Sequence, residues 1–160
     1  KKKDYSYTDI EIGHNMILDE FGAILGLSQL RILEKFIKVR TAIARKYDAA
    51  ISNIGYLEKA INYNNDEDYI GSYYRYPLIL REDINAEDFE EHMNTVGVKL
   101  GHYPMVHQTQ VYREKKALIR YGKLSTSNYL SGRLFSLPIF NSMSATQADK
   151  VIKSLHDFAE

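Results

Sequence analysis

The chain has 160 residues, which suits a single domain over 1–160, and about 70% of the surface of an unfolded chain of this length is buried on folding. Its 21 lysines and arginines balance its 21 aspartates and glutamates, so no net charge attracts nucleic acid or an anionic membrane. The absence of cysteine excludes disulfides and thiolate chemistry, and without a signal peptide or a run of about 20 apolar residues we expect a cytoplasmic protein that does not bind membranes.

The longest helical pattern runs from Gly13 to Tyr47 and contains no proline. Asn15 or Asp19 is expected to cap its start, because a short side-chain oxygen there accepts a hydrogen bond from an unpaired backbone N–H. Gly22 and Gly26 lie one turn apart and leave a flat strip that favours close packing against another helix. The apolar positions form one stripe that we expect to face a core: Phe21, Ile24, Leu25, Leu30, Leu33, Phe36, Ile37 and Ile43.

Two turns and a strand are predicted to follow the long helix. Ala50–Glu58 contains a short extended or turn piece around Gly55, and Asn62–Asp68 is a polar, acidic turn. Alternating tyrosine, isoleucine and leucine residues predict a strand over Tyr69–Leu80. Pro77 within this strand indicates an edge position or a bulge, because proline has no N–H for the ladder.

The second half of the chain alternates short helices with short strands. The predicted elements are a helix over Ala86–Thr95 capped by Asn85, a strand over Val98–Leu100, helical turns over Ser127–Arg133, a strand over Leu134–Ile139, and a last helix that Ser144 caps with Gln147. This order predicts an α+β domain: a long N-terminal helix, then a small antiparallel or mixed sheet with helices on one side.

Several chemical motifs fail on inspection. The YGKLS stretch at Tyr121–Ser125 resembles a phosphate-binding loop, but a leucine follows the lysine and Ala117 stands where the first glycine belongs. His102 and His107 lie five residues apart across a proline-containing loop, which is not a metal-ligand spacing, so we expect no metal site. The carboxylates in 87–91 are typical of a solvated helix face.

A longer pattern surrounds the start of the long helix. It consists of Gly13, Asn15, Glu20, Ala23, Gly26, Leu27, Gln29, Leu30, Leu33, Arg40 and Tyr47. These residues match the G-aromatic-N-x-[RK]-M-[ST]-[DE]-[IL]-Q-A-A-x-G-L-x-Q-L pattern, with its following leucine-spaced helix, of the DegT/StrS family of pyridoxal-phosphate-dependent sugar aminotransferases. The chain therefore resembles the small C-terminal domain of these fold-type I aminotransferases. The resemblance continues nearly to the end of the chain, where Phe135–Ile139 and Met143 are similar to the closing S-L-P motif of the family, a structural one.

The resemblance implies roles for three residues. In the family, the asparagine of the G-x-N motif binds the cofactor phosphate of the opposite subunit, which implies a homodimer and a cofactor-binding role for Asn15. An amide near a helix start suits an anionic phosphate, although the same residue could serve only as a helix cap. The stretch from Tyr103 to His107 (YPMVH) is similar to the family's Y-x-P-L-H loop, so Tyr103 and His107 are implied to bind a nucleotide-sugar substrate.

Four positions depart from the family pattern. Ile17 replaces an arginine or lysine and removes a cation expected near a phosphate. Gly22 replaces a glutamine, His14 an aromatic residue and Asp19 a serine or threonine. These departures concern the anchoring of the substrate more than the fold.

The chain lacks the central group of the chemistry that the resemblance implies. Transamination with pyridoxal phosphate needs a Schiff-base lysine and a carboxylate on the pyridine nitrogen. In the family both lie upstream of the G-x-N motif, and no lysine here has that context. We therefore assign no catalytic residue to this chain and expect no pyridoxal phosphate bound to the chain alone. Since it begins with Lys1 rather than methionine, we expect a processed or trimmed product.

Two hypotheses follow. The chain is the C-terminal domain of an aminotransferase that acts on a keto-sugar nucleotide in amino-sugar or polysaccharide biosynthesis. Alternatively, it is a non-catalytic interaction domain derived from the same family, which Ile17 and Gly22 favour.

Overall fold

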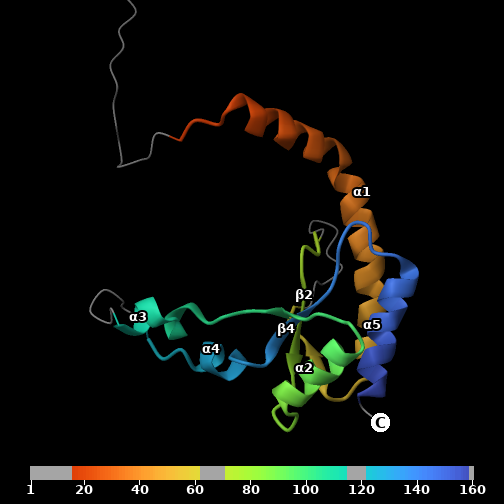
Figure 1. The fold of residues 1–160 in the computed structure, drawn as a ribbon, viewed down its shortest axis with the longest axis vertical. Coiled ribbons are helices and arrows are strands. Elements are labelled where there is room, and N and C mark those ends of the chain that lie inside the picture. The colour runs from red at the N-terminus through yellow and green to blue at the C-terminus, as the bar shows by residue number, and fades with distance from the viewer. Residues whose placement is uncertain (1–15, 62–70, 115–121, 159–160) are drawn as a thin grey trace, which may run out of the picture. The chain divides into compact units, whose positions relative to one another are not determined.

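The structure is a computed structural model that describes residues 16–61, 71–114 and 122–158 (Figure 1). It divides into two compact units, Lys1–Glu34 and Lys35–Glu160, whose boundary lies inside the first helix. The predicted turn at Asn62–Asp68 and the residue Asn15 fall outside the described residues. The single domain over 1–160 stays a prediction.

The predicted long helix is α1, Glu20–Ile51, which begins seven residues after the predicted start at Gly13. Of the two predicted caps, Asp19 is confirmed, because its Oδ1 accepts a hydrogen bond from the backbone N–H of Gly22 at 2.8 Å. The helix continues one turn beyond Tyr47. Neither α1 nor any other helix in the described ranges combines the length and apolar character that a membrane crossing needs.

The apolar stripe of α1 is buried only in the second half of the helix. Ile43 and Tyr47 are buried, whereas Phe21 is 87% exposed and Leu25 is 62% exposed. Apart from Gly26, its two chain neighbours and the surrounding backbone of the helix, no heavy atom in the described part of the chain lies within 4 Å of the position that a Cβ on Gly26 would take. The prediction that the whole stripe faces a core is therefore wrong for the first turns. The spacing of apolar residues in the sequence identifies the apolar stripe, but it does not show whether that stripe packs within this chain.

Four short strands form one antiparallel sheet. They are β1 (Leu57–Lys59), β2 (Tyr76–Leu80), β3 (Gly101–His102) and β4 (Leu134–Leu137), and their order in the sheet is β1-β2-β4-β3. The predicted strands over 69–80 and 134–139 are confirmed as β2 and β4 in shortened form. The strand predicted over 98–100 lies at Gly101–His102 instead, because these two residues pair with β4. The strand β1 overlaps the end of the extended or turn piece predicted over Ala50–Glu58, although no strand was assigned there.

Pro77 lies in the inner strand β2, so the predicted edge position is wrong. It pairs with Ser136 on β4, while pairing with β1 stops at Leu78. The N–H of Arg81 donates to the carbonyl of Tyr56, which lies on the β1 side. Backbone nitrogens alternate between the two sides of a strand, so the nitrogen of Pro77, four residues earlier, faces the same side. The ring nitrogen therefore points beyond the end of β1, where the ladder needs no donor.

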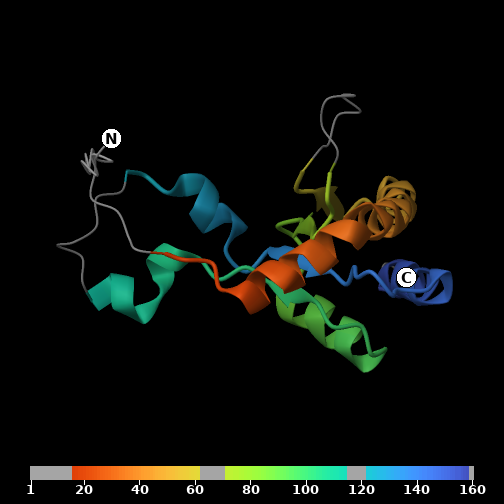
Figure 2. The same cartoon turned by 90° about the horizontal axis from the view of Figure 1, so that it is seen from above.

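Two capped helices pack on the sheet. In α2, Ala86–Thr95, the Asn85 side chain accepts from the N–H of Glu87 at 2.9 Å. In α5, Ala145–Asp157, Ser144 and Gln147 form the predicted capping box. Figures 1 and 2 show α2, α5 and the second half of α1 around the sheet, and their buried side chains form one core with a single face of β2 and β4. The largest side chains buried there are Tyr47, Phe89, Leu78, Leu80, Met93, Leu137 and Leu155. The helices on one side of the sheet are thus confirmed.

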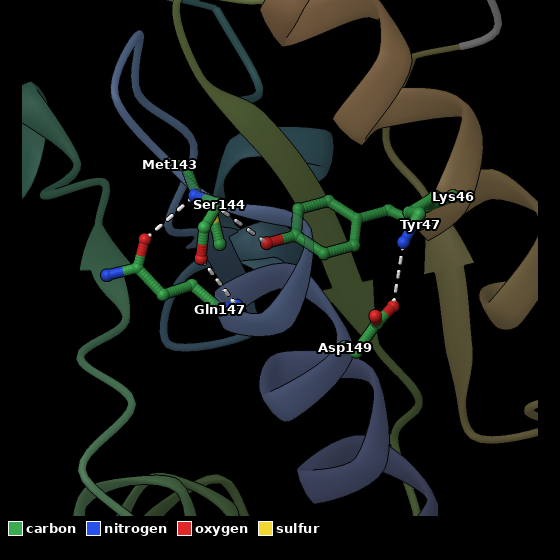
Figure 3. A network of polar contacts seen from close by, with 6 residues as sticks. All are labelled: Lys46, Tyr47, Met143, Ser144, Gln147 and Asp149. Carbon is green, nitrogen blue, oxygen red and sulfur yellow. Dashed lines mark hydrogen bonds and ion pairs between the residues drawn. The ribbon is translucent and has the colours of Figure 1, made fainter.

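Tyr47 joins α1 to the segment between β4 and α5 (Figure 3). Its hydroxyl donates to the carbonyl of Pro138 at 2.8 Å and lies 3.7 Å from Sδ of Met143. Burial raises the pKa of the Tyr47 phenol, so the hydroxyl keeps its proton and remains a donor. Nearby, an exposed ion pair joins Lys46 to Asp149 at 2.9 Å. Tyr47 and the closing motif therefore form one structural contact.

The connection from β3 to β4, residues 103–133, is called the arm. It carries a 3₁₀ turn η1 (Val106–Gln108) and the helices α3 (Gln110–Glu114) and α4 (Ser125–Leu130). Both views show α3 and α4 projecting away from the sheet (Figures 1 and 2). The helical turns predicted over 127–133 correspond to α4.

Candidate functional site

A cavity of about 600 Å³ lies where α2, β3 and the two ends of the arm come together. Its volume falls within the range of roughly 300–1,000 Å³ that is usual for small-molecule sites. Glu90 reaches it from α2, His102 from β3, Tyr103 from the start of the arm and Ser131 from its end. The cavity therefore depends on the sheet register that sets β3 beside β4.

Tyr103, which the resemblance implies in substrate binding, lines this cavity. The guanidinium carbon of Arg75 lies 5.1 Å from the centre of the Tyr103 ring. Such a cation–π contact restrains the ring and leaves its hydroxyl as a donor or acceptor for a ligand. The structure is thus compatible with a binding role for Tyr103.

His107 lies in the hydrogen-bond network of the arm rather than in the wall of the cavity. Its Nε2 donates to Oδ1 of Asn128 in α4 at 2.8 Å. The neighbouring Gln108 accepts from the hydroxyl of Ser131 at 2.8 Å, so two adjacent residues link the outgoing and returning limbs of the arm. The substrate-binding role of His107 stays a prediction.

Sequence reasoning missed the pairing of a histidine with a carboxylate in the cavity wall. Nε2 of His102 lies 3.0 Å from Oε1 of Glu90, and the imidazole ring packs against Phe135 at 5.5 Å between centroids. A histidine beside a carboxylate can hold or pass a proton at a ligand hydroxyl. The sequence analysis dismissed both side chains separately, because they pair only when the chain returns from α2 into β3.

The cavity does not fit pyridoxal phosphate. None of the described residues that line it is a lysine or an arginine, so it offers neither a Schiff-base amine nor a cation for the phosphate. Glu87 and Glu90 line it instead, and their carboxylates would repel a phosphate. Within the described ranges, no cluster of histidine, aspartate and glutamate side chains could hold a metal ion. Asn15, the residue implied to bind the cofactor, lies outside those ranges.

A long helix leading into a small antiparallel sheet, with helices on one face, is the small C-terminal domain of a fold-type I aminotransferase. The model of the DegT/DnrJ/EryC1/StrS aminotransferase family matches residues 1–156, and the chain belongs to this family.

Solved structures show the same fold. Helicobacter pylori PseC, an aminotransferase involved in the biosynthesis of pseudoaminic acid, is 22% identical with a TM-score of 0.76, and the match covers 98% of this chain and 42% of that one. S. venezuelae DesV, solved in complex with a ketimine intermediate, is 21% identical with a TM-score of 0.77, and the match covers 100% of this chain and 41% of that one. A DegT DnrJ EryC1 StrS aminotransferase from Brucella abortus is 24% identical with a TM-score of 0.75, and the match covers 98% of this chain and 40% of that one. The chain thus spans about two fifths of the length of these structures.

Proposed function

We propose that the chain is the C-terminal domain of a pyridoxal-phosphate-dependent aminotransferase that acts on a keto-sugar nucleotide in amino-sugar or polysaccharide biosynthesis. The observation that carries the proposal is the family match over residues 1–156. Support also comes from PseC, which is described as an aminotransferase of pseudoaminic acid biosynthesis. A cytoplasmic location is the expectation from the cysteine-free sequence.

In this proposal the chain binds and orients the sugar nucleotide. The Schiff-base lysine that carries the cofactor lies elsewhere in a homodimer. Pyridoxal phosphate supplies an electron sink when it is bound. The Asn15 amide donates a hydrogen bond to its phosphate. The start of α1 is compatible with this role, because Asp19 provides the helix cap and leaves Asn15 four residues before it. Tyr103 and His107 contact the sugar nucleotide.

The test separates the two binding roles in the full-length dimeric enzyme. Asn15→Ala should weaken retention of the cofactor by about tenfold or more, because a hydrogen bond to a charged group is worth ~1.5–3 kcal/mol. His107→Ala should raise the Michaelis constant for the sugar nucleotide and leave the cofactor in place. Equilibrium dialysis of the cofactor and steady-state kinetics measure the two effects.

Asn94→Ala is the matched control, since Asn94 is exposed on α2. It should change neither quantity. If Asn15→Ala retains the cofactor as the unmodified enzyme does, the proposed role of Asn15 is wrong.

The second candidate function is a non-catalytic interaction domain. The observation that favours it is Ile17, which is 83% exposed and stands where the family has a cation. A full-length protein that binds pyridoxal phosphate and aminates a keto-sugar nucleotide would exclude this alternative.

A further inference from the structure

Four hydrogen-bonded side chains join the two limbs of the arm and are here called the clasp: His107, Gln108, Asn128 and Ser131. Two of them lie in η1 on the outgoing limb, and two lie in or directly after α4 on the returning limb. The Oδ1 of Asn128 lies 2.8 Å from Nε2 of His107 and 3.4 Å from Nε2 of Gln108. Asn128 is therefore the centre of the clasp.

The returning limb presents Asn128 from the side of the arm that is anchored to the sheet. The backbone N–H of Asn128 donates to the carbonyl of Leu124 at 2.8 Å, within the helical turn of α4. Farther along, the carbonyl of Arg133 accepts from the N–H of Leu80 at 3.0 Å and ties the limb to β2. The guanidinium carbon of Arg133 also lies 5.3 Å from the centre of the ring of Tyr129, the neighbour of Asn128.

The outgoing limb presents His107 from the closed turn η1. Within this turn the N–H of Gln108 donates to the carbonyl of Met105 at 2.9 Å. The cavity wall beside Tyr103 includes Gln108 and Ser131. The clasp thus connects His107, which lies outside that wall, to two residues that belong to it.

The hydrogen bonds of the clasp run in one direction. The hydroxyl of Ser131 donates to Oε1 of Gln108 at 2.8 Å, and the amide of Gln108 donates to Oδ1 of Asn128. Because Oδ1 can only accept, the Nε2 of His107 that faces it carries a proton. A neutral imidazole has one N–H, so Nδ1 is then the unprotonated nitrogen. The partner of one ring nitrogen thus fixes which nitrogen holds the proton.

We propose that Asn128 is a positioning residue for His107, which holds the imidazole in one orientation and keeps the proton of the neutral ring on Nε2. A side chain that is ordered before its ligand arrives loses less conformational entropy on binding, so the ligand binds more tightly. This inference rests on the proposed function for the ligand of His107, the sugar nucleotide. It deepens that function by naming the residue that prepares His107 for binding.

Nuclear magnetic resonance of the imidazole nitrogens in the 15N-labelled 160-residue chain tests the tautomer, at a pH above the titration of the ring. Only one nitrogen of a neutral ring carries a proton, so the two nitrogens give separate shifts. We expect a single tautomer of His107 with the proton on Nε2. Asn128→Ala should move both shifts toward those of an exchanging mixture, whereas Asn128→Asp, which keeps an acceptor oxygen, should retain the tautomer.

Two results of this measurement would overturn the proposal. One is a proton on Nδ1 in the unmodified chain, because the clasp would then run in the opposite direction. The other is a pair of shifts that Asn128→Ala leaves unchanged. Since Asn128 is exposed, its substitution leaves the core intact, and circular dichroism checks that each variant is folded.

Steady-state kinetics of the full-length enzyme test the role in binding. Asn128→Ala should raise the Michaelis constant for the sugar nucleotide about two- to tenfold, the range that one hydrogen bond is worth, with little change in kcat. Asn128→Asp should restore most of the loss. Thr126→Ala, at an exposed position on the same helix, is the matched control and should have no effect.

A double-mutant cycle shows whether Asn128 acts through His107. In the His107→Ala enzyme, Asn128→Ala should have no further effect, because the residue that it positions is already absent. An equal rise of the Michaelis constant in both backgrounds would contradict the proposal.

The positioning role and the proposed function fail separately. If the full-length enzyme aminates a keto-sugar nucleotide with a Michaelis constant that Asn128→Ala leaves unchanged, the positioning role fails alone. If His107 shows a single tautomer that depends on Asn128, but the full-length protein aminates no keto sugar, the proposed function fails alone.

Discussion

The hydroxyl of Tyr47 links two positions of the family pattern that are 91 residues apart, the end of the leucine-spaced helix and the S-L-P motif. The ring is completely buried and lies 5.1 Å from the ring of Tyr76 in an edge-to-face contact. Burial also raises the pKa of the Tyr76 phenol, and the hydrogen bond from its hydroxyl to Asp48 at 2.6 Å raises it further. These two tyrosines therefore stabilise the fold and take no part in the candidate site.

Tyr47→Phe should lower the free energy of unfolding by about 1–3 kcal/mol, since it leaves the partly buried carbonyl of Pro138 without this donor while keeping the ring. Urea unfolding measures the change as a lower midpoint at an unchanged slope. Tyr112→Phe, at an exposed position on α3, is the control and should have no effect. An unchanged midpoint for Tyr47→Phe would show that the hydrogen bond does not stabilise the fold.

Helix caps were predictable from sequence, whereas the pair in the cavity wall was not. Asp19, Asn85 and Ser144 each bond to backbone or side chains within three residues, so local sequence is sufficient to identify them. The pair of Glu90 with His102 depends on how the chain turns after α2 and enters the sheet. Tyr103 was placed in the site by the family resemblance and not by any periodicity.

At the scale of elements, the first turns of α1 present apolar side chains in several directions. Leu25 and Leu27 lie on different sides of the helix, and both are exposed, as is Leu30. A helix that is apolar on most sides is normally buried. We therefore expect a surface outside the described part of the chain to cover these turns in the assembled enzyme.

Gly26→Leu tests this expectation. In the 160-residue chain the variant should not lose stability, because nothing described lies near Gly26 and leucine favours helix over glycine by ~1 kcal/mol. In the full-length enzyme the same change should weaken the fold or the dimer by about 1–3 kcal/mol through overpacking. Thermal unfolding and sedimentation of both proteins, with Gly26→Ala as the conservative control, measure the difference. Unchanged behaviour of the full-length variant would show that the strip is open surface there too.

Strand limits were predicted less well than helix limits, for a physical reason. The strand β1 has three residues and β3 has two, which is too short for an alternating pattern to be recognised. Pro77 was assigned to an edge because its missing N–H forbids pairing on one side, but β1 ends before it reaches that side. Where a strand stops depends on its neighbour, and a single sequence segment does not contain that information.

At the scale of the whole molecule, we expect this chain to contribute substrate contacts and a structural core, and not the Schiff-base lysine. It spans about two fifths of the related structures, 42% of PseC and 41% of DesV. None of the described residues lining the cavity is a lysine, and the lysines of the chain lie outside the family's lysine-loop context. In the proposed enzyme another domain therefore carries the Schiff-base lysine, whereas this domain binds the substrate and contributes Asn15 to the cofactor phosphate.

The measurement that tests this division most directly is borohydride reduction of the full-length enzyme loaded with pyridoxal phosphate, followed by peptide mass spectrometry. Reduction fixes the cofactor to the lysine that carries it. The account predicts one stoichiometric label, on a lysine outside residues 1–160, and only substoichiometric labels when the 160-residue chain is treated alone. A stoichiometric label on a single lysine within residues 1–160, such as Lys99, would contradict it.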